Sequence, residues 1–443
     1  MVMNQEFGRA SGRLEESLAL FKELGPAGKQ GMAYALLRLA SLPARQDRAD
    51  ILQQSLAWFR EIGDKFGAAE SLMQFSGLVQ ADNYKQAVLF TEEQLALSRE
   101  IGDQDGIACG LAGLADLALS QDNYQQAIRF YEESLAAYRT VKNLGAISMT
   151  FGSLGDLFFW QGDYQRARQT YEEARAFALD LGYRFHIAFY FYSLGILAWF
   201  RGEYSQAMQQ VSSGQSIFRD IGNHWLAISS LHTLGDIALA QGDEERATRW
   251  YEDELAFSRE VGLEPPRIFA LKGLGDAARV IGDYGQAFKH YQESLRMSRA
   301  ANIKQGTFHS LCGLGRLAQS QGDYDKAYTS YLEALELQKR RVSPLFNWSG
   351  PKTYSATVSY PLEGLAILAS AQNRMGRAAR LIGAAENFYT PLRFEMSAKE
   401  RAEHDRVIAA ARLALGEEAF AKAWAEGQSM SLEEAVIYAL DES

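Results

Sequence analysis

The amino-acid sequence predicts an all-α fold in which pairs of helices stack into a solenoid. A break of the Gly-Asp-Tyr type separates two helical runs and recurs in steps of 40 residues. A fixed period of this size is typical of stacked repeats. The hydrophobic content of 47% suffices for a continuous core along the stack. A tyrosine follows the break in most copies: Tyr84, Tyr124, Tyr164, Tyr204, Tyr284 and Tyr324.

The first helix of each copy carries apolar residues three positions apart, as in Phe151 and Leu154, which marks one helical face. A glycine follows the second apolar residue. Because a glycine inside a helix costs about 1 kcal/mol relative to alanine, its recurrence requires a packing reason, and close approach of the second helix provides one. The recurring glycines are Gly155, Gly195, Gly235, Gly275 and Gly315.

The second helix of each copy begins after a residue of a type that caps helix N-termini well, with Glu203 as the exception. An alanine four residues later, as Ala167 after Asp163, is expected to let the two helices cross closely. The capping residues are Asn83, Asn123, Asp163, Asp243, Asp283 and Asp323.

Two segments are expected to depart from the repeat pattern. Residues 1–10 are predicted to form a disordered lead before an array that covers 11–389. Within the array, 341–361 is predicted to be an irregular long loop, and loops of this length are often functional or disordered. Three of its apolar residues are expected either to pack on the adjoining helices or to dock into the groove or onto a partner: Leu345, Phe346 and Trp348.

The C-terminal segment 390–443 is predicted to be a helical cap that covers the open end of the solenoid. Two Ser-x-x-Glu sequences, at Ser397 and Ser431, have the form of a capping box. The expected helices lie near 398–415, 417–426 and 431–440, after a last repeat pair at 362–372 and 377–388.

One copy matches a known repeat residue by residue, through Phe151, Leu154, Gly155, Phe158, Ala167 and Tyr171. It resembles the tetratricopeptide repeat, in a 40-residue variant of the usual period of 34. The resemblance covers roughly residues 29–389 and implies a right-handed solenoid of about nine helix pairs with a C-terminal helical cap.

The C-terminal part, including 377–386 and 416–427, is similar to the end of bacterial regulators of the STAND ATPase class, such as LuxR-type and AfsR-like proteins. These regulators carry an ATPase, a repeat superhelix and often a DNA-binding module. This chain is expected to hold only the superhelix and its cap. The nearest sequence to a phosphate loop, 25–30, lacks the Gly-x4-Gly-Lys spacing.

The charge, the cysteine content and the hydropathy limit the possible partners and the cellular location. A net charge of -10 opposes the phosphate backbone, so nucleic acid is not expected as a direct partner. Cys109 and Cys312 lie too many repeats apart for a disulfide in a solenoid, which favours a reducing, cytoplasmic location. The sequence holds no apolar run of about 18 residues, so no membrane-spanning helix is predicted.

A row of acidic residues is expected on the concave groove, which in tetratricopeptide repeats is lined by first helices. The resemblance points to the position two residues after each Leu of the Leu-Gly pair. Two interpretations remain open: solvated or salt-bridged carboxylates, or a track for a basic peptide or cationic group. The row consists of Asp116, Asp156, Asp236 and Asp276, interrupted by Ile196 and Arg316.

An aromatic cluster halfway along the groove is a second candidate site. Phe189, Tyr192 and Trp199 fall on the expected groove face, with Phe159 in the preceding repeat and His232 in the next. The cluster predicts either a ligand pocket or side chains that fill a wide gap between helices.

Catalytic and metal-binding patterns are weak. His309 and Cys312 share one helical face near Asp276, but residues of these types meet easily by chance on adjacent helices. No His or Cys complements His224 and His232 at metal-ligand spacing. No enzymatic activity, cofactor or metal is therefore predicted.

The favoured hypothesis is a non-enzymatic scaffold or regulatory module that binds a protein or peptide segment, possibly basic, in its concave groove. The alternative is a small-molecule effector sensor of a bacterial transcriptional regulator, with the aromatic cluster as its pocket.

Overall fold

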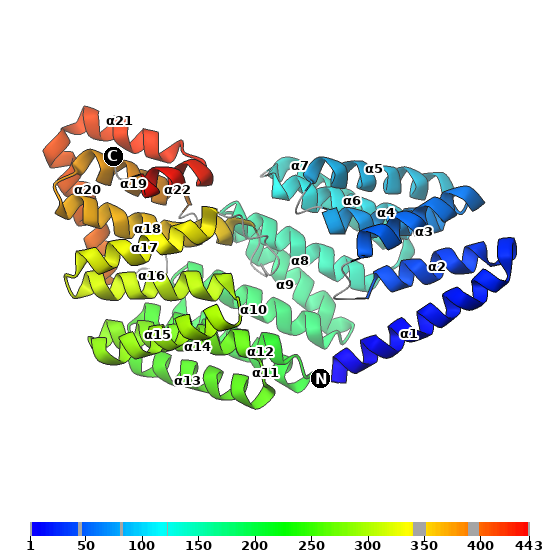
Figure 1. Ribbon diagram of the computed structural model, residues 1–443, viewed down its shortest axis with the longest axis horizontal. Helices are drawn as coiled ribbons and strands as arrows, with labels where there is room; N and C mark the ends of the chain where they lie inside the picture. Colours follow the sequence, from blue (N-terminus) through cyan, green and yellow to red (C-terminus); the bar gives the residue numbers. More distant parts are fainter. Residues whose placement is uncertain are drawn as a thin grey trace. The chain divides into compact units, whose positions relative to one another are not determined.

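The computed structural model is built of helices, and the residues that it describes contain no strand (Figure 1). The described residues are 2–42, 47–79, 83–121, 123–339, 351–388 and 398–441. The predicted all-α class is thereby confirmed. No helix in these ranges is long and apolar enough to cross a membrane.

The helices form two compact units, Met1–Gln161 and Gly162–Ser443. Unit 1 contains α1 (Val2–Glu23), the short η1 (Gly25–Gly28), α2 (Lys29–Ala40), α3 (Arg48–Ile62), α4 (Lys65–Val79), α5 (Tyr84–Ile101), α6 (Gln104–Ser120), α7 (Tyr124–Val141) and α8 (Leu144–Trp160). Within the unit, α2 packs on α3, α4 on α5 and α6 on α7.

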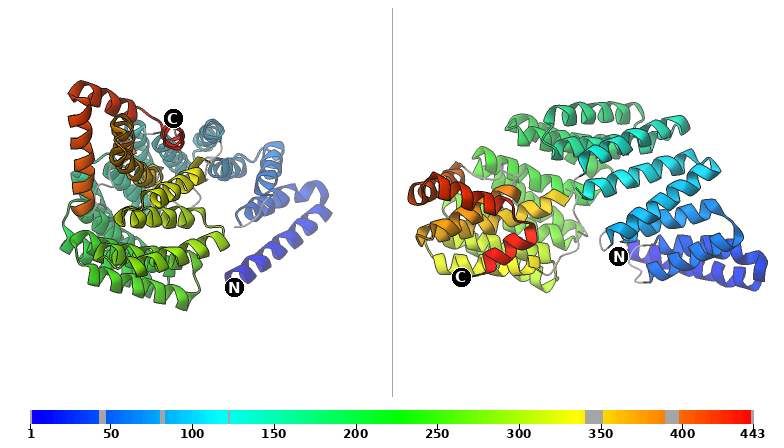
Figure 2. Two further views of the ribbon diagram at one scale, coloured as in Figure 1. Left: turned by 60° about the vertical axis from the view of Figure 1, so that its left-hand side comes forward. Right: turned by 90° about the horizontal axis from the view of Figure 1, so that it is seen from above.

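Unit 2 continues the same pattern of helix pairs (Figure 2). Its helices are α9 (Tyr164–Asp180), α10 (Arg184–Phe200), α11 (Tyr204–Asp220), α12 (His224–Gln241), α13 (Glu244–Val261), α14 (Glu264–Ile281), α15 (Tyr284–Ala300), α16 (Lys304–Ser320), α17 (Tyr324–Lys339), α18 (Pro351–Ala371), α19 (Met375–Phe388), α20 (Ala398–Leu415), α21 (Glu417–Gln428) and α22 (Leu432–Leu440). The pairs from α10 and α11 to α18 and α19 pack helix on helix.

The predicted N-terminal caps of the second helices are present. At α9, for example, the Asp163 side chain accepts a hydrogen bond from the backbone N–H of Arg166, which satisfies a donor that the helix itself leaves unpaired. Glu203 makes no such bond at the start of α11. The same side-chain cap occurs at Asn83, Asn123, Asp243, Asp283 and Asp323.

The recurring glycines Gly235, Gly275 and Gly315 make room for tyrosine rings of the second helices, whereas Gly195 faces Val211. The Tyr251 ring is fully buried between Gly235 of its own repeat and Gly273 of the next. A methyl group at Gly273 would lie 2.6 Å from this ring, which is closer than side chains approach. Tyr291 is held in the same way between Gly275 and Gly313. The predicted close approach of the two helices is confirmed at these repeats.

The N-terminal segment differs from its prediction. Residues 1–10 were expected to be disordered, but Val2 onward belongs to α1. No proline interrupts this run, and Leu14 and Leu18 of the same helix pack against the core of the first repeats. The contacts of Leu14 and Leu18 therefore stabilise the helix to which Val2 onward belongs.

The predicted loop 341–361 is helical in its second half. Residues 341–350, with Leu345, Phe346 and Trp348, lie outside the described residues, whereas α18 already begins at Pro351. Proline is well tolerated at the first position of a helix, where its missing N–H costs no hydrogen bond. The helix then continues through Pro361 because its later turns are buried against α17 and α19.

The C-terminal cap has the three helices predicted for it, α20 to α22. At Ser431 both hydrogen bonds of the predicted capping box form, from the backbone of Glu434 to the serine hydroxyl and from the serine backbone to the Glu434 carboxylate. Ser397 lies outside the described residues. Helices α19 and α21 pack closely, as Gly383 and Gly427 bring their backbones together.

Candidate functional site

The predicted groove aspartates Asp116, Asp236 and Asp276 each accept a hydrogen bond from a tyrosine on the second helix of the same repeat. The Tyr251 hydroxyl donates to Asp236 Oδ1 at 2.5 Å, and the Tyr291 hydroxyl donates to Asp276 Oδ1 at 2.5 Å. Tyr131 donates to Asp116 in the same way. Each carboxylate therefore satisfies a hydroxyl whose ring is buried between helices.

The two interruptions of the acidic row fit this structural role. Where the second helix carries Val211 in place of tyrosine, the first helix carries Ile196 in place of aspartate. Beside Arg316, Tyr331 donates instead to Gln319 Oε1 at 3.0 Å. The spacing of 15 residues between aspartate and tyrosine was visible in the sequence, and it would have shown that the row belongs partly to the architecture.

Unit 1 contains a recess of about 320 Å³ that is lined by the first helices α4, α6 and α8 and by the second helices α5 and α7. We call it the unit 1 recess. Small residues open it, including Gly77, Gly110, Ala112 and Gly113. Its other lining residues are Met73, Ser76, Thr91, Gln94, Cys109, Asp116, Leu117, Tyr131, Tyr138, Ala146, Met149, Thr150 and Ser153.

Asp116 is the predicted site residue that lines this recess. Its carboxylate is solvent-exposed, yet protein atoms surround it on most sides. The resulting loss of hydration raises the pKa of Asp116 to about 6, although the hydrogen bond from Tyr131 opposes the shift. Near neutral pH the group is therefore mostly a carboxylate.

Gln94 is a recess residue that the sequence did not indicate. Only 3% of its surface is exposed, and its amide nitrogen donates to Ser98 Oγ at 3.0 Å and to the backbone oxygen of Gly106 at 2.9 Å. Its Oε1 atom is buried, lies against Gly110 and accepts no hydrogen bond. A buried acceptor without a donor costs free energy, so it marks a place where a ligand donor is favourable.

Three first helices of unit 2, α10, α12 and α14, have large side chains at the position of Ala112. Steps of 40 residues from Ala112 lead to Gly152 in unit 1 and, in unit 2, to Tyr192, His232, Lys272 and the smaller Cys312. The Tyr192 hydroxyl lies 3.0 Å from Thr233 Oγ1, and burial raises the pKa of Tyr192. These side chains occupy, with partners of their own, the position that is small in unit 1.

His232 is held by two carboxylates. Its Nδ1 atom lies 2.9 Å from Glu254 Oε2, and its Nε2 atom lies 3.6 Å from Asp236 Oδ2. Burial alone would lower the pKa of His232, but the two acidic neighbours outweigh burial and raise it to about 9. The predicted groove residues His232 and Asp236 thus form an ion pair inside unit 2.

Asp276 is also neutralised by its surroundings. Lys272 Nζ lies 2.8 Å from Asp276 Oδ2, and only 5% of Asp276 is exposed. Burial would raise the pKa of Asp276, yet Lys272, Arg316 and Arg279 together lower it. In unit 2 the acidic row is therefore engaged with cations of the same chain, as the salt-bridge interpretation predicts.

The aromatic candidates are divided between the two units. In unit 2, Trp199 is 6% exposed and belongs to the core, while Phe189 and Tyr192 are partly buried and pack against the same core. In unit 1, the buried Phe159 contacts Trp160 edge-on, and Asp156 is half-buried on α8. These contacts agree with the gap-filling interpretation of the cluster.

His309 and Cys312 do not have the chemistry of a nucleophile and its base. Burial raises the pKa of the Cys312 thiol to about 12, and burial together with Lys272 lowers the pKa of His309 to about 3. A neutral thiol beside a weakly basic imidazole disfavours thiolate attack. Both cysteines are free, and the described residues hold no group of three or more metal-ligating side chains.

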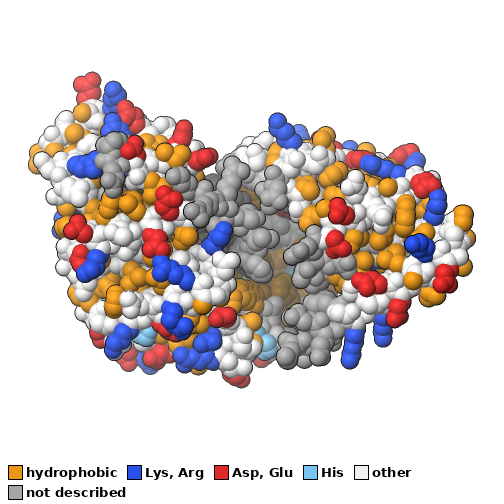
Figure 3. Space-filling model, in the orientation of Figure 1, with side chains coloured by type: hydrophobic (Ala, Val, Ile, Leu, Met, Phe, Trp, Pro, Cys, Tyr) orange, Lys and Arg blue, Asp and Glu red, His pale blue; other side chains and the backbone are white. Residues whose placement is uncertain are grey.

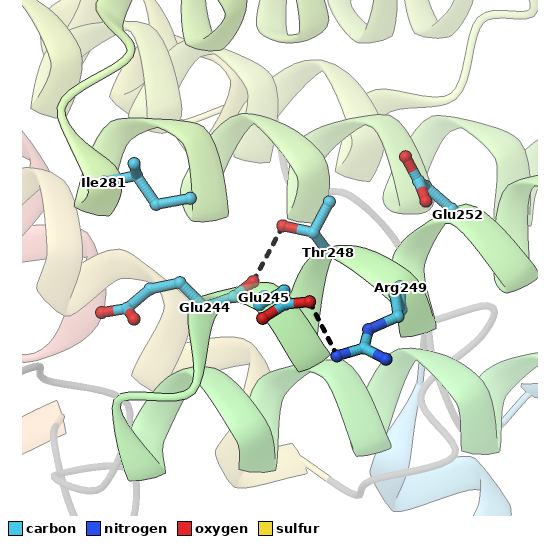
Figure 4. Close-up of a pocket in the computed structure, with 6 residues that line it drawn as sticks. All are labelled: Glu244, Glu245, Thr248, Arg249, Glu252 and Ile281. Atoms are coloured by element: carbon cyan, nitrogen blue, oxygen red, sulfur yellow. Dashed lines mark hydrogen bonds and ion pairs between the residues drawn. The ribbon is translucent and has the colours of Figure 1, made fainter.

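A second hollow lies in unit 2, between the start of α13 and the end of α14 (Figure 4). Glu244, Glu245 and Glu252 line it, together with Ile281, which is 61% exposed. Arg249 pairs with Glu245 at 3.0 Å inside the hollow. It is wide open and holds no buried polar group, so the unit 1 recess is the stronger candidate.

Charged side chains of both signs are interspersed among apolar ones on the surface shown in Figure 3. No continuous basic patch is visible on that face among the described residues. A binding mode based on phosphate contacts would require such a patch.

Two segments of the chain match the tetratricopeptide repeat, residues 111–144 and residues 267–340. The first segment includes part of the unit 1 recess, with Asp116 and Tyr131. No curated protein matches the sequence.

Solved structures with a similar fold include aspartyl phosphate phosphatase F from Bacillus subtilis, with a TM-score of 0.52 and 11% identity over 88% of this chain and 96% of that chain. The apo form of the quorum sensor NprR from B. thuringiensis has a TM-score of 0.50 and 13% identity over 76% of this chain and 99% of that chain.

A third similar structure is a signal transduction ATPase with numerous domains and a tetratricopeptide repeat sensor, from Pyrococcus horikoshii. Its TM-score is 0.46 and its identity 12%, over 84% of this chain and 56% of that chain. At such identities the similarity concerns the fold. Together with the two repeat matches, the comparisons confirm that this chain has the predicted tetratricopeptide-repeat fold, an all-α solenoid.

Proposed function

We propose that this chain is a scaffold or regulatory interaction module that binds a peptide or protein segment in the unit 1 recess. The observation that carries the proposal is the recess itself, which is already open between α4, α6 and α8. Rigid helices that present a preformed site lose little conformational entropy on binding, so a short segment can bind there with useful affinity.

The lining of the recess supports a peptide as the ligand. Met73, Met149 and Leu117 offer apolar and adaptable contacts, whereas Gln94 and Asp116 offer polar acceptors. A few polar groups on a mostly apolar surface are typical of sites that fix the orientation of a ligand. The predicted groove residues of unit 2, His232, Asp236 and Asp276 among them, are engaged with each other or with nearby cations.

A small-molecule effector sensor remains the second candidate function. Its support is the volume of the recess, about 320 Å³, which lies at the lower end of the range of small-molecule sites. The aromatic residues Phe189, Tyr192 and Trp199 lend it less support because they pack against the core of unit 2.

The proposal is tested by selecting a displayed library of random peptides on the full chain and on the variant Ala112→Tyr. A tyrosine occupies the equivalent position at 192, so the repeat backbone accommodates this side chain. The native chain should enrich a family of related peptides. Ala112→Tyr should weaken the binding of an enriched peptide at least about tenfold in fluorescence anisotropy, because it fills the recess.

The matched control is Ala136→Tyr, which adds the same side chain at an exposed position of α7. It should bind the enriched peptides like the native chain. The proposal fails if the native chain enriches no peptide family, or if Ala112→Tyr binds the enriched peptides as tightly as Ala136→Tyr does. A metabolite that raises the melting temperature of the native chain but not of Ala112→Tyr would favour the sensor function instead.

A further inference from the structure

The hydroxyl donors of the unit 1 recess are already hydrogen-bonded within the chain, whereas some of its acceptors can still accept a hydrogen bond from a ligand. The Tyr131 hydroxyl donates to Asp116 Oδ1, and the Thr150 hydroxyl donates to the backbone oxygen of Ala146 at 2.8 Å. Ser76 and Thr91 lie 2.6 Å apart and are both directed to the backbone oxygen of Ala87. The donors of the recess are thus engaged within the chain.

Two acceptors remain. Gln94 Oε1 is buried and accepts no hydrogen bond, and the Asp116 carboxylate has a second oxygen beyond the one bonded to Tyr131. They come from different helices, α5 and α6, and line the same recess. A ligand group with several N–H donors and no acceptor fits such a surface, and ammonium and guanidinium groups have this property.

The charges around the recess have one sign. None of its lining residues is a lysine, an arginine or a histidine, while Asp116 is an acid. Asp103 and Asp105 act on the Cys109 thiol beside Asp116, and Asp156 acts on Tyr131. These carboxylates favour a positive charge in the recess.

The walls of the recess are suited to an aliphatic stem. Met73 and Cys109 are in contact through their sulfur atoms at 3.2 Å, and Met149 and Leu117 line the same space. Methionine side chains adapt to flexible apolar groups. The methylene groups of lysine and arginine bury well against such surfaces while the charged end reaches a polar partner.

Resting on the function proposed above, we infer that the unit 1 recess binds a lysine or arginine side chain of the partner peptide. The charged end would be held by the Asp116 carboxylate and Gln94 Oε1, and the aliphatic stem would lie between Met73 and Met149. The recess would then select peptides by one basic anchor residue rather than by overall charge.

The inference is tested with a synthetic peptide array. The array presents peptides of the family that the native chain enriches, synthesised as matched pairs. One member of each pair carries lysine at a given position and the other norleucine, which keeps the stem and loses the charge. A second set compares arginine with citrulline. The native chain should bind the charged members at least about tenfold more tightly at one position of the peptide, and only at that position.

The variant Asp116→Asn keeps an acceptor for Tyr131 and removes the charge, so it should abolish most of this preference. The control is Asp236→Asn, which makes the same change beside Tyr251, in a repeat where His232 occupies the equivalent of Ala112. It should keep the preference. Gln94→Leu should reduce the affinity for the charged peptides by a smaller factor, because it removes a single acceptor.

The inference is overturned if norleucine and citrulline peptides bind as tightly as their charged partners, or if Asp116→Asn keeps the preference. Peptide binding that is blocked by Ala112→Tyr but shows no preference for charge would overturn the basic anchor alone and leave the proposed function standing. An absence of any peptide binding by the native chain would overturn both.

Discussion

At the scale of residues, glycine, tyrosine and aspartate act as one set in several repeats. In the repeat of α14 and α15, the Tyr291 ring fills the space left by Gly275 and Gly313, and its hydroxyl binds Asp276. The recurrence of the glycine predicted close packing, whereas the carboxylate partner did not follow from the repeat pattern. The recurring spacing of 15 residues and the joint replacement of Tyr and Asp by Val211 and Ile196 carried that information in the sequence.

Adding a methyl group at Gly275 should therefore destabilise the fold. In Gly275→Ala the new Cβ would lie 2.6 Å from the Tyr291 ring, and the ring is fully buried between two helices. Overpacking of this kind costs about 1–3 kcal/mol, more than the gain of about 1 kcal/mol in helix propensity. Thermal and urea unfolding followed by circular dichroism should show lower midpoints than the native chain.

Gly285→Ala is the matched control because Gly285 is also helical but exposed, with only the Asp283 carboxylate near the added Cβ, at 3.5 Å. Its unfolding midpoint should stay equal or rise slightly. Equal shifts for the two variants would mean that the Tyr291 ring does not limit this position.

At the scale of elements, the caps were predictable because they depend on local sequence, whereas α1 and the later turns of α18 are stabilised by tertiary contacts. The same holds for the attachment of the C-terminal cap. His404 of α20 is 5% exposed, with Nδ1 at 2.8 Å from Glu363 Oε1 of α18 and Nε2 at 3.1 Å from Glu386 Oε1 of α19. Two acidic residues on separate helices thus hold the cap through one imidazole.

This arrangement predicts a pH-dependent contribution to stability. Burial alone would lower the pKa of His404, but Glu363 and Glu386 outweigh it and raise the pKa to about 9, above the value of about 6.5 in an unfolded chain. The folded state binds the proton more tightly, so the contribution is complete below about pH 6.5 and is lost as the pH rises through about 9.

The measurement compares the melting temperatures of the native chain and His404→Gln between pH 6 and pH 9.5. The native chain should melt higher at pH 6, and the difference should shrink as the pH rises. His290→Gln is the control, since burial and Lys289 lower the pKa of His290 and its removal should not produce this trend. A difference that is constant with pH would show that His404 is neutral in the folded chain.

At the scale of the whole molecule, the repeats of the two units share their architecture but differ in the side chains that their first helices carry. Period, caps and helix order followed from the sequence because most copies repeat them. The candidate site did not, because it depends on one position, which is small at Ala112, Gly152 and Cys312 but large at Tyr192, His232 and Lys272. The predicted acidic and aromatic site residues are spread over both units, with Asp116, Asp156 and Phe159 in unit 1, so they did not single out one recess.

A bound peptide should accordingly protect unit 1 and leave unit 2 unchanged. In a repeat protein each helix pair contacts mainly its neighbours, so a ligand lowers the local opening of the helices that it touches and of those next to them. Hydrogen–deuterium exchange of the native chain, with and without a saturating enriched peptide, should show slower exchange in α4 to α8. Exchange in α12 to α16 should stay within error, because His232 and Lys272 already hold their partners there in the free chain. The Ala112→Tyr variant with the same peptide should show no protection in either region. Protection centred on α12 to α16 would instead move the binding site to unit 2 and refute the assignment of the recess.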